Sequence, residues 1–409
     1  MKTIAITLSI FFISFFHLFS QVQWESVQTP VSENFTSVWI LDTGKIIIVS
    51  DQGTIVKTND GGVTWNTSAF AGNNFRSIYF LDNLNGAFVS NGTNVGVFKT
   101  NDGGENWQSF AVDSLDTGNA LFLTNNNNIY VVGSFENKNN IRISYDGGLN
   151  WVKSFMPYII GSEFYDIFFR DENNGIMVGT DGVFYSTNDG GALWGMNITF
   201  PVVNLNAIYN FGEQYGIVVG DEGKAFFTIN DWYQYIDLNT NVAADLNGVW
   251  GAPGTFKMWA VGDSGTILFS EYYPLGWIIQ NSGTTENLND VFILNENFGV
   301  AVGDNGTVLF MSNPNSVGEL SRNAEISVFP NPFKNKTKIR YDISSQCPVE
   351  LKVFDLPGNE VLSLFKGEKQ PGSYEIVFDA SGLHSGIYFV RLNAGSYSTF
   401  KKIVITGGK

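Results

Sequence analysis

The sequence predicts an all-β protein, with a seven-bladed β-propeller closed by its N-terminal strand and a small C-terminal β-sandwich. Three observations support this prediction. A short apolar segment recurs seven times at spacings of 40 to 46 residues, and each copy opens a unit of short strands. Apolar residues alternate with period 2 inside the units, with no helical stripe. After Ser312 the repeat stops and a strand-rich region of different charge follows.

The chain begins with the features of a secretory signal peptide, which we assign to residues 1–20. Lys2 precedes a mainly apolar run from Ile4 to Phe19, and Ser20 supplies a small residue at a plausible cleavage point. The run is shorter than the ~20 apolar residues that span a bilayer, and nothing comparable recurs downstream. We therefore expect no transmembrane segment after signal removal.

Residues 21–312 contain the seven repeat units. Their opening segments are FTSVW at 35, FRSIY at 75, GNALF at 118, FYDIF at 164, LNAIY at 205, LNGVW at 246 and LNDVF at 288. In the first unit FTSVWIL, KIIIVS, TIVKT and TWNTSAF alternate with clusters of Asp, Gly and Asn. Four strands in each unit of this length are typical of propeller blades around a central channel.

The fifth residue of every opening segment is aromatic. These residues are Trp39, Tyr79, Phe122, Phe168, Tyr209, Trp250 and Phe292. The residues two positions earlier are small or short: Ser37, Ser77, Ala120, Asp166, Ala207, Gly248 and Asp290. Both positions lie on one face of the innermost strand, because side chains alternate with period 2. We expect the aromatic residues to pack between blades; a ligand-binding aromatic ring is the alternative, which seven equivalent copies disfavour.

The seventh unit stops before its outer strand. No strand with a tryptophan follows residues 300–312. The segment QVQWESVQT near the mature N-terminus carries Trp24 at the position in the repeat that the tryptophan of the missing strand would occupy. We expect this segment to close the seventh blade, because such closure joins the first and last blades and removes exposed sheet edges.

A second motif, TNDGGVTW at residues 58–65, recurs as TNDGGENW, SYDGGLNW and TNDGGALW. Its aspartate is suited to an Asx-turn and its two glycines allow positive φ angles, so we interpret it as a turn rather than a site. A catalytic acid would need one special copy. Here four units carry similar copies, and the fifth unit has Asn230 at the position of Asp60.

Four other aspartates are the candidate binding residues: Asp51, Asp221, Asp263 and Asp304. They follow the second strand of their units, in loops that we expect on the face opposite the TNDGGVTW turns. These loops lie nearer the channel, where ligands of propellers usually bind. The same aspartates are also suited to forming Asx-turns.

Histidine and cysteine are scarce, with His17 in the signal peptide and His384 and Cys347 near the C-terminus. We therefore predict no catalytic residue, no metal site and no cofactor. Residues 21–318 carry 10 Lys and Arg against 30 Asp and Glu, whereas residues 319–409 carry 12 against 9. The acidic surface of the first region disfavours nucleic acid as a partner.

The motif S/T-x-D-x-G-x-T/N-W resembles the Asp-box, or BNR repeat, of sialidases and related propellers. Together with VGDSGT at 261–266 and VGDNGT at 302–307, residues 22–312 resemble the photosystem II stability/assembly factor family of seven-bladed propellers. In the photosynthetic members a basic face is regarded as the partner-binding surface. This chain has only Arg76, Arg142 and Arg170 in the corresponding region, so the resemblance does not imply a photosystem role.

Residues 313–325 form a polar linker, and residues 326–409 are expected to form the β-sandwich. ISVFPNPF, VELKVFDLPGNEV, SYEIVFDASGLHSGIYFVRL and STFKKIVIT follow one another here. Their order resembles the C-terminal sorting domain of type IX secretion cargo. The resemblance implies that the type IX translocon is a partner and that the protein is secreted or displayed on the outer-membrane surface of a Gram-negative bacterium.

The sequence thus favours a non-enzymatic, secreted or cell-surface propeller that binds an extracellular protein or glycan. The alternative is a carboxylate-dependent glycoside hydrolase acting on extracellular polysaccharide. That alternative requires two carboxyl groups about 5–9.5 Å apart across the channel, one of them with a raised pKa.

Overall fold

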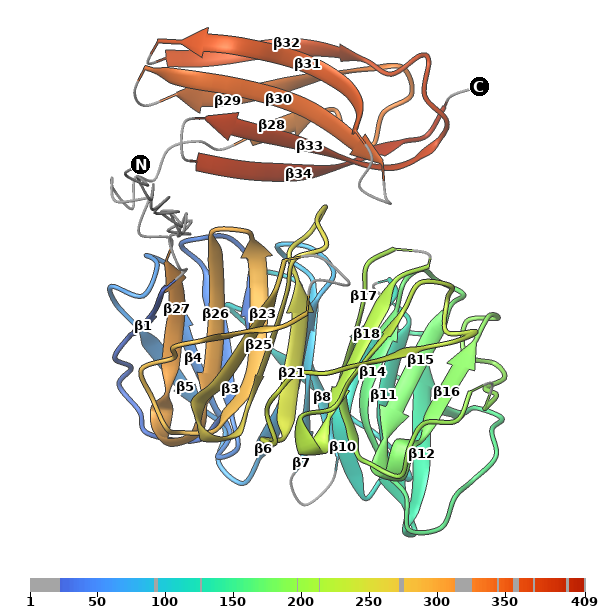
Figure 1. Cartoon of the computed structure of the whole chain (residues 1–409). Helices are drawn as coiled ribbons and strands as arrows, with labels where there is room; N and C mark the ends of the chain where they lie inside the picture. The colour runs from blue at the N-terminus through green and yellow to red at the C-terminus, as the bar shows by residue number, and fades with distance from the viewer. Residues whose placement is uncertain are drawn as a thin grey trace, which may run out of the picture.

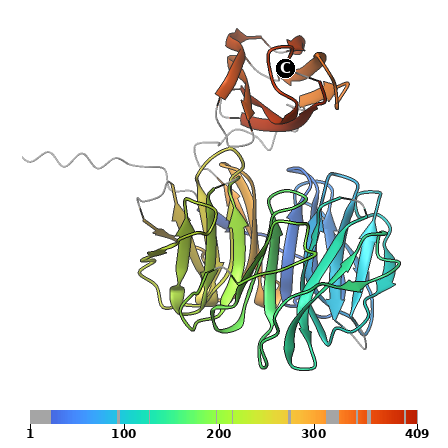
Figure 2. The same ribbon diagram turned by 90° about the vertical axis from the view of Figure 1, so that its right-hand side faces the viewer.

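The structure, a computed structural model, describes residues 23–91, 95–125, 127–196, 198–212, 214–271, 276–312, 326–343, 346–355, 360–370, 372–394 and 397–407. The expected signal peptide and linker lie outside these residues. The described residues form two bodies, a ring of seven sheets and a C-terminal pair of sheets (Figures 1 and 2). Their regular elements are strands and four 3-10 turns, which confirms the all-β prediction.

We name the seven propeller sheets blades 1 to 7 in chain order. Blade 1 contains β2 (Phe35–Ile40), β3 (Ile46–Ser50), β4 (Thr54–Thr58) and β5 (Asn66–Ala69); blade 2 contains β6 (Asn74–Phe80), β7 (Gly86–Asn91), β8 (Gly96–Thr100) and β9 (Gln108–Ala111); blade 3 contains β10 (Thr117–Leu123), β11 (Ile129–Phe135), β12 (Lys138–Ser144) and β13 (Val152–Lys153); blade 4 contains β14 (Phe164–Phe169), β15 (Gly175–Gly179) and β16 (Phe184–Thr187). Blade 5 contains β17 (Leu205–Asn210), β18 (Gly216–Gly220), β19 (Ala225–Thr228) and β20 (Ile236–Leu238); blade 6 contains β21 (Leu246–Gly251), β22 (Met258–Gly262), β23 (Thr266–Ser270) and β24 (Ile278–Gln280); blade 7 contains β25 (Leu288–Asn295), β26 (Phe298–Gly303), β27 (Val308–Ser312) and β1 (Gln23–Ser26). The 3-10 turns η1 (Thr180–Gly182), η2 (Asp221–Gly223), η3 (Asp263–Gly265) and η4 (Asp304–Gly306) join the second and third strands of blades 4 to 7.

The first strand of each blade is innermost, and these strands contact one another in order around the ring, with β25 meeting β2. Each of them contains a β-bulge near its start. In blade 1 the register with β3 shifts between Phe35 and Ser37, and the other six blades repeat this shift. We number the five residues of each opening segment 1 to 5, so that the extra residue of the bulge is position 2. A bulge changes the direction of the side chain at the extra residue.

The propeller core lies between blades rather than inside any one of them. The second strands β3, β15, β18 and β22 are buried at every residue. Both faces of such a strand pack against neighbouring blades, which is why the sequence there is a continuous apolar run such as IIIV at 46–49.

The N-terminal strand β1 belongs to blade 7, where it pairs antiparallel with β27. Trp24 lies opposite Met311 in this pairing and is only 6% exposed. Its indole Nε1 donates a hydrogen bond of 2.8 Å to Oε1 of Gln280 in blade 6. The segment therefore contacts two blades and connects the two ends of the propeller.

Blade 4 differs from the four-strand expectation, because its sheet has three strands. The chain beyond β16 returns to it only through a single bridge between Ser186 and Gly195. Just before this point the backbone of Phe155 pairs instead with Ala192 and Trp194. These contacts to the blade 3–4 connection take up the backbone groups that would begin a fourth strand.

The C-terminal region forms two antiparallel sheets that share one apolar core. The first contains β28 (Ile326–Phe329), β29 (Lys336–Ile343) and β32 (Gly372–Asp379); the second contains β31 (Glu360–Lys369), β30 (Cys347–Asp355), β33 (Gly386–Ala394) and β34 (Tyr397–Ile405). Alternate residues of β30, Val349, Leu351 and Val353, are fully buried, as expected for one face of a sandwich.

Candidate functional site

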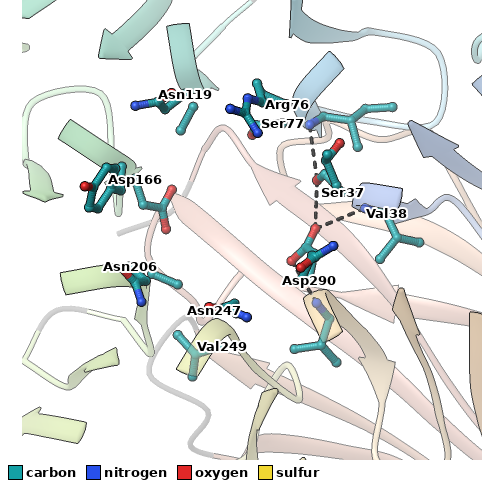
Figure 3. Close-up of a pocket in the computed structure, with 18 of the residues that line it drawn as sticks. Ser37, Val38, Arg76, Ser77, Asn119, Asp166, Asn206, Asn247, Val249 and Asp290 are labelled. Atoms are coloured by element: carbon teal, nitrogen blue, oxygen red, sulfur yellow. Dashed lines mark hydrogen bonds between the residues drawn. The ribbon is translucent and has the colours of Figure 1, made fainter. Parts of the chain in front are cut away.

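The innermost strands surround a cavity of about 660 Å³ at the centre of the propeller. Residues from all seven blades line it, and Figure 3 shows several of them around the open space. The lining has three levels. Position 2 side chains and the adjacent loops form the rim, position 3 side chains form the wall, and position 5 side chains form the floor.

The rim is held together by hydrogen bonds between blades. In five blades the position 2 side chain donates to the backbone carbonyl of position 1 in the next blade. These bonds join Thr36 to Phe75 (2.9 Å), Asn119 to Phe164 (2.8 Å), Asn206 to Leu246 (3.0 Å), Asn247 to Leu288 (3.1 Å) and Asn289 to Phe35 (2.9 Å). The bulge thus gives most position 2 residues a structural role.

Arg76 and Tyr165 are the two exceptions at position 2. Neither side chain makes a hydrogen bond or ion pair with a residue that the structure describes, and Arg76 is exposed. Among the described residues that line the cavity, Arg76 is also the only cationic one. The other two propeller arginines bond elsewhere, Arg142 to Asn140 and Arg170 to Asp231.

The wall contains two aspartates, Asp166 in blade 4 and Asp290 in blade 7, which project into the cavity from opposite sides (Figure 3). Asp166 accepts backbone hydrogen bonds from Ile167 at Oδ1 (2.7 Å) and from Ile208 of blade 5 at Oδ2 (2.9 Å). The carboxyl group therefore connects two blades.

Asp290 makes a similar connection between blades 7 and 1. Its Oδ2 accepts hydrogen bonds from Oγ of Ser37 (2.7 Å) and from the backbone of Val38 (3.0 Å), and its Oδ1 accepts one from Val291 (2.8 Å). Ser37 Oγ in turn accepts a hydrogen bond from the backbone of Ile78 in blade 2 (3.3 Å). One carboxyl group thus supports a chain of contacts across three blades.

Both wall aspartates have raised pKa values. Desolvation by burial raises the pKa of Asp166 to about 7, against the lowering effect of its two backbone hydrogen bonds, and the charge of Asp290 raises it further. Desolvation likewise raises the pKa of Asp290 to about 6. Neither group has a cationic partner among the described residues that line the cavity walls.

The floor is a closed ring of the seven position 5 aromatic side chains. Ring centroids of neighbours lie 4.8 Å apart for Trp39–Tyr79, 4.2 Å for Tyr79–Phe122, 5.4 Å for Phe122–Phe168, 5.5 Å for Phe168–Tyr209, 4.9 Å for Tyr209–Trp250, 4.6 Å for Trp250–Phe292 and 4.6 Å for Phe292–Trp39. Trp39 and Trp250, which are two blades apart, also approach to 5.7 Å. The rings therefore pack between blades, as expected, and also narrow the channel below the cavity.

Three of the four predicted binding residues line the cavity: Asp51, Asp221 and Asp304. Asp263 occupies the equivalent turn of blade 6 but is not part of the lining. All four carboxylates accept hydrogen bonds from asparagine side chains; Asp221, for example, accepts one from Asn204 and one from Asn206, each 2.8 Å. Their structural role in the turns therefore coexists with their position at the cavity.

Asp51 departs from this pattern at one atom. Its Oδ2 accepts a hydrogen bond from Asn34 (3.1 Å), whereas its Oδ1 is buried without a partner among the described residues. Blade 1 has Thr36 where blades 5 to 7 have asparagine, and Thr36 donates to backbone carbonyls instead. Blade 1 therefore lacks the asparagine side chain that donates a hydrogen bond to Oδ1 of the aspartate in blades 5 to 7.

The TNDGGVTW turn lies between β4 and β5, away from the cavity lining. Asp60 accepts hydrogen bonds from Thr64 at both carboxylate oxygens and from Thr58 at Oδ1. These bonds, the Thr64 side-chain bond first, lower the pKa of Asp60 to about 2. Gly61 and Gly62 have φ angles of 70° and 86°, a conformation that glycine adopts without strain.

Sequence reasoning missed the wall aspartates, because Asp166 and Asp290 were grouped with small residues such as Ser37 and Gly248. One signal was available: only these two of seven equivalent positions carry an acid. Among the described residues no group of three or more His, Cys, Asp or Glu side chains is arranged to hold a metal ion. No helix in the same part of the chain is long and apolar enough to cross a bilayer.

Comparison with known proteins identifies the C-terminal region and the fold of the propeller. A family model described as "Secretion system C-terminal sorting domain" matches residues 327–406. This domain implies export by the type IX secretion system to the cell surface or beyond it. No curated protein sequence matches the chain.

The propeller is similar to several solved structures at low sequence identity. A YCF48 structure described as bound to D1 peptide has a TM-score of 0.59 and 18% identity, over 71% of this chain and 96% of its own; YCF48 from Cyanidioschyzon merolae has 0.59 and 16%, over 71% and 99%. The GH74 xyloglucanase from Xanthomonas campestris has a TM-score of 0.58 and 11% identity, over 79% of this chain and 60% of its own. These similarities establish a β-propeller fold.

Proposed function

We propose that this exported propeller binds an extracellular protein or glycan in its central cavity and does not catalyse a reaction. The observation that carries the proposal is the cavity itself, about 660 Å³, with a polar rim and an aromatic floor. Ligand sites in proteins are commonly concave, with aromatic surface and a few convergent polar groups. The YCF48 structure with a bound peptide provides a precedent for ligand binding on a similar fold.

A glycoside hydrolase is the second candidate, and one observation favours it. Asp166 and Asp290 project from opposite walls of one cavity, and both have raised pKa values. The GH74 xyloglucanase shares the propeller fold. A buried carboxyl group with a pKa near neutrality is suited to act as a general acid.

Two features favour binding over hydrolysis. Glycosidases need one carboxyl group protonated and the other ionised, so their pKa values are driven apart, whereas both pKa values here are raised, to about 7 and about 6. In addition, each oxygen of both carboxyl groups already accepts a hydrogen bond that joins or orders the inner strands. This structural role explains the two acids without a reaction.

The experiment compares two serine-to-phenylalanine variants of the full mature chain. Ser77→Phe fills the cavity from blade 2, whereas Ser68→Phe makes the same change on exposed β5. A glycan array and a displayed peptide library serve as ligand sources. We expect to find ligands that bind the wild type and Ser68→Phe equally and do not bind Ser77→Phe.

Equal binding by Ser77→Phe would place the ligand outside the cavity and overturn the proposal. The hydrolase candidate is tested on xyloglucan and other polysaccharides with the same preparations. Hydrolysis that is abolished in Asp166→Asn would replace binding by catalysis as the function of the cavity.

A further inference from the structure

The chemistry of the cavity points to the charge of its ligand. In the part of the lining that the structure describes there are six carboxyl groups and one cationic side chain: Asp51, Glu163, Asp166, Asp221, Asp290 and Asp304 against Arg76. Cavities with walls of low dielectric focus the field of such groups and attract the opposite charge. The excess of acid lies inside the cavity as well as over the propeller surface.

The aromatic floor is independent evidence for the same preference. Six of its seven side chains line the cavity, and the faces of aromatic rings attract organic cations. Trp39 and Trp250, the strongest cation-binding ring type, lie side by side there. Burial raises the pKa of Tyr79 and Tyr209, so their phenols stay neutral and the floor adds no anion of its own.

The wall aspartates lie directly above this floor, because positions 3 and 5 share a face of the same strand. Asp166 is thus two residues before Phe168, and Asp290 is two residues before Phe292, in inner strands three blades apart. Both aspartates are partly exposed residues, and both line the cavity. An ammonium group resting on the rings would lie between two carboxyl groups.

We propose that the cavity binds the side chain of a lysine or arginine presented by an extracellular partner protein, an inference that rests on the proposed function. The aromatic rings would hold the alkyl stem and the cation, with Asp166 and Asp290 as counter-charges. The raised pKa values fit this assignment, since they are what two buried carboxyl groups have when no cation accompanies them.

The narrowed channel favours a protein side chain over a glycan. Because the rings narrow the channel below the cavity, a ligand that enters from the rim reaches the aromatic floor as an end group. A side chain does so naturally, whereas a polysaccharide could insert only its terminal unit. An amino sugar at a glycan end would share the cationic chemistry and is therefore distinguished by the test.

The test titrates the full mature chain with five probes, monitored by calorimetry and by the fluorescence of the floor tryptophans. The probes are the peptide Gly-Gly-Lys-Gly-Gly with an acetylated N-terminus and an amidated C-terminus, its norleucine and glutamate counterparts with the same blocked ends, glucosamine and N-acetylglucosamine. We expect the lysine peptide to bind roughly tenfold or more tightly than the norleucine peptide, which has the same stem without the charge. The glutamate peptide should not bind.

Two variants and one control test the residues. Asp166→Asn/Asp290→Asn should abolish the preference for lysine over norleucine. Arg76→Gln should tighten lysine binding, because it removes a like charge, and it should fold normally because Arg76 is exposed without a partner among the described residues. Asp263→Asn, an equivalent turn outside the lining, should bind as wild type does.

Several outcomes would overturn this assignment. Equal binding of the norleucine peptide, or weaker lysine binding by Arg76→Gln, would contradict a cationic ligand while leaving cavity binding intact. Glucosamine binding without lysine binding would contradict the protein side chain. If no probe binds and no array ligand is sensitive to Ser77→Phe, the proposed function itself fails.

Discussion

Raising the pH should destabilise the propeller through the two wall aspartates. Their folded-state pKa values, about 7 for Asp166 and about 6 for Asp290, lie above the ordinary value of 3.8. A carboxyl group with a raised pKa stabilises the folded state below its unfolded pKa, and this contribution is lost as the pH rises through the folded pKa. This stability should therefore be lost as the pH rises from about 4 to about 7.

The magnitude follows from the pKa values. Between pH 5 and pH 8 both carboxyl groups are ionised in the unfolded state. In the folded state Asp166 stays protonated over about two of these pH units and Asp290 over about one. Each pH unit over which only the folded state holds the proton corresponds to about 1.4 kcal/mol of stability. The free energy of unfolding should therefore fall by up to roughly 4 kcal/mol. Aspartates with lowered pKa values, such as Asp60 and Asp102 at about 2, lose their contribution as the pH falls and so act outside this window.

The assay is urea unfolding of residues 21–409 at pH 5, 6, 7 and 8. The variant Asp166→Asn/Asp290→Asn cannot ionise at these positions, so its unfolding free energy should change little over the window. An amide has one acceptor oxygen, so each substitution loses a backbone hydrogen bond, and the variant should be less stable than wild type at pH 5 by about 1–3 kcal/mol per site. If the free energy of unfolding changed with pH in the same way for both proteins, the pH dependence would not come from Asp166 and Asp290, and the reasoning would be refuted.

Four further predictions concern closure, the turn motif, the rim and export. Trp24→Ala should lower the free energy of unfolding by about 3–5 kcal/mol, because the indole is buried between blades 6 and 7, whereas Trp24→Phe should lose less; unchanged urea midpoints for both would mean that the blade closes some other way. Asp60→Ala should lower the melting temperature and leave ligand affinity intact, since its carboxylate bonds only within its own turn; lost affinity would make the turn a binding site. Asp221→Asn/Asp304→Asn should weaken ligand binding more than Asp263→Asn does, because only the first two line the cavity, and equal effects would contradict this. Deleting residues 326–409 should leave a folded protein in the periplasm, and normal surface appearance of the truncated protein would argue against export through this domain.

The sequence by itself determined the features that depend on local patterns. Strand alternation and turn residues recur within each unit, so the all-β class and the propeller follow from repetition of FTSVW-like segments alone. The place of Trp24 also followed from the repeats, because the seventh unit lacks the outer strand that carries an aromatic residue in the other units. The sorting domain was predicted from motifs that lie within one stretch of chain, and the family model confirms it.

Only the tertiary structure decided which side chains share the cavity. Asp166 and Asp290 lie in different repeat units, and their side chains share one cavity only because the inner strands come together around the channel. The bulge at position 2 is equally hidden, because an extra residue in a strand pairing is defined by the partner strand. Blade 4 lost its fourth strand to contacts with Phe155, which belongs to the preceding connection.

The physical reason for this division lies in the propeller itself. Each blade is built from contacts within about forty residues, so the local sequence determines it. The cavity instead takes one or two side chains from each blade, and its charge and the pKa values of its acids come from burial among residues far apart in the chain. Such properties exist only once the ring has closed.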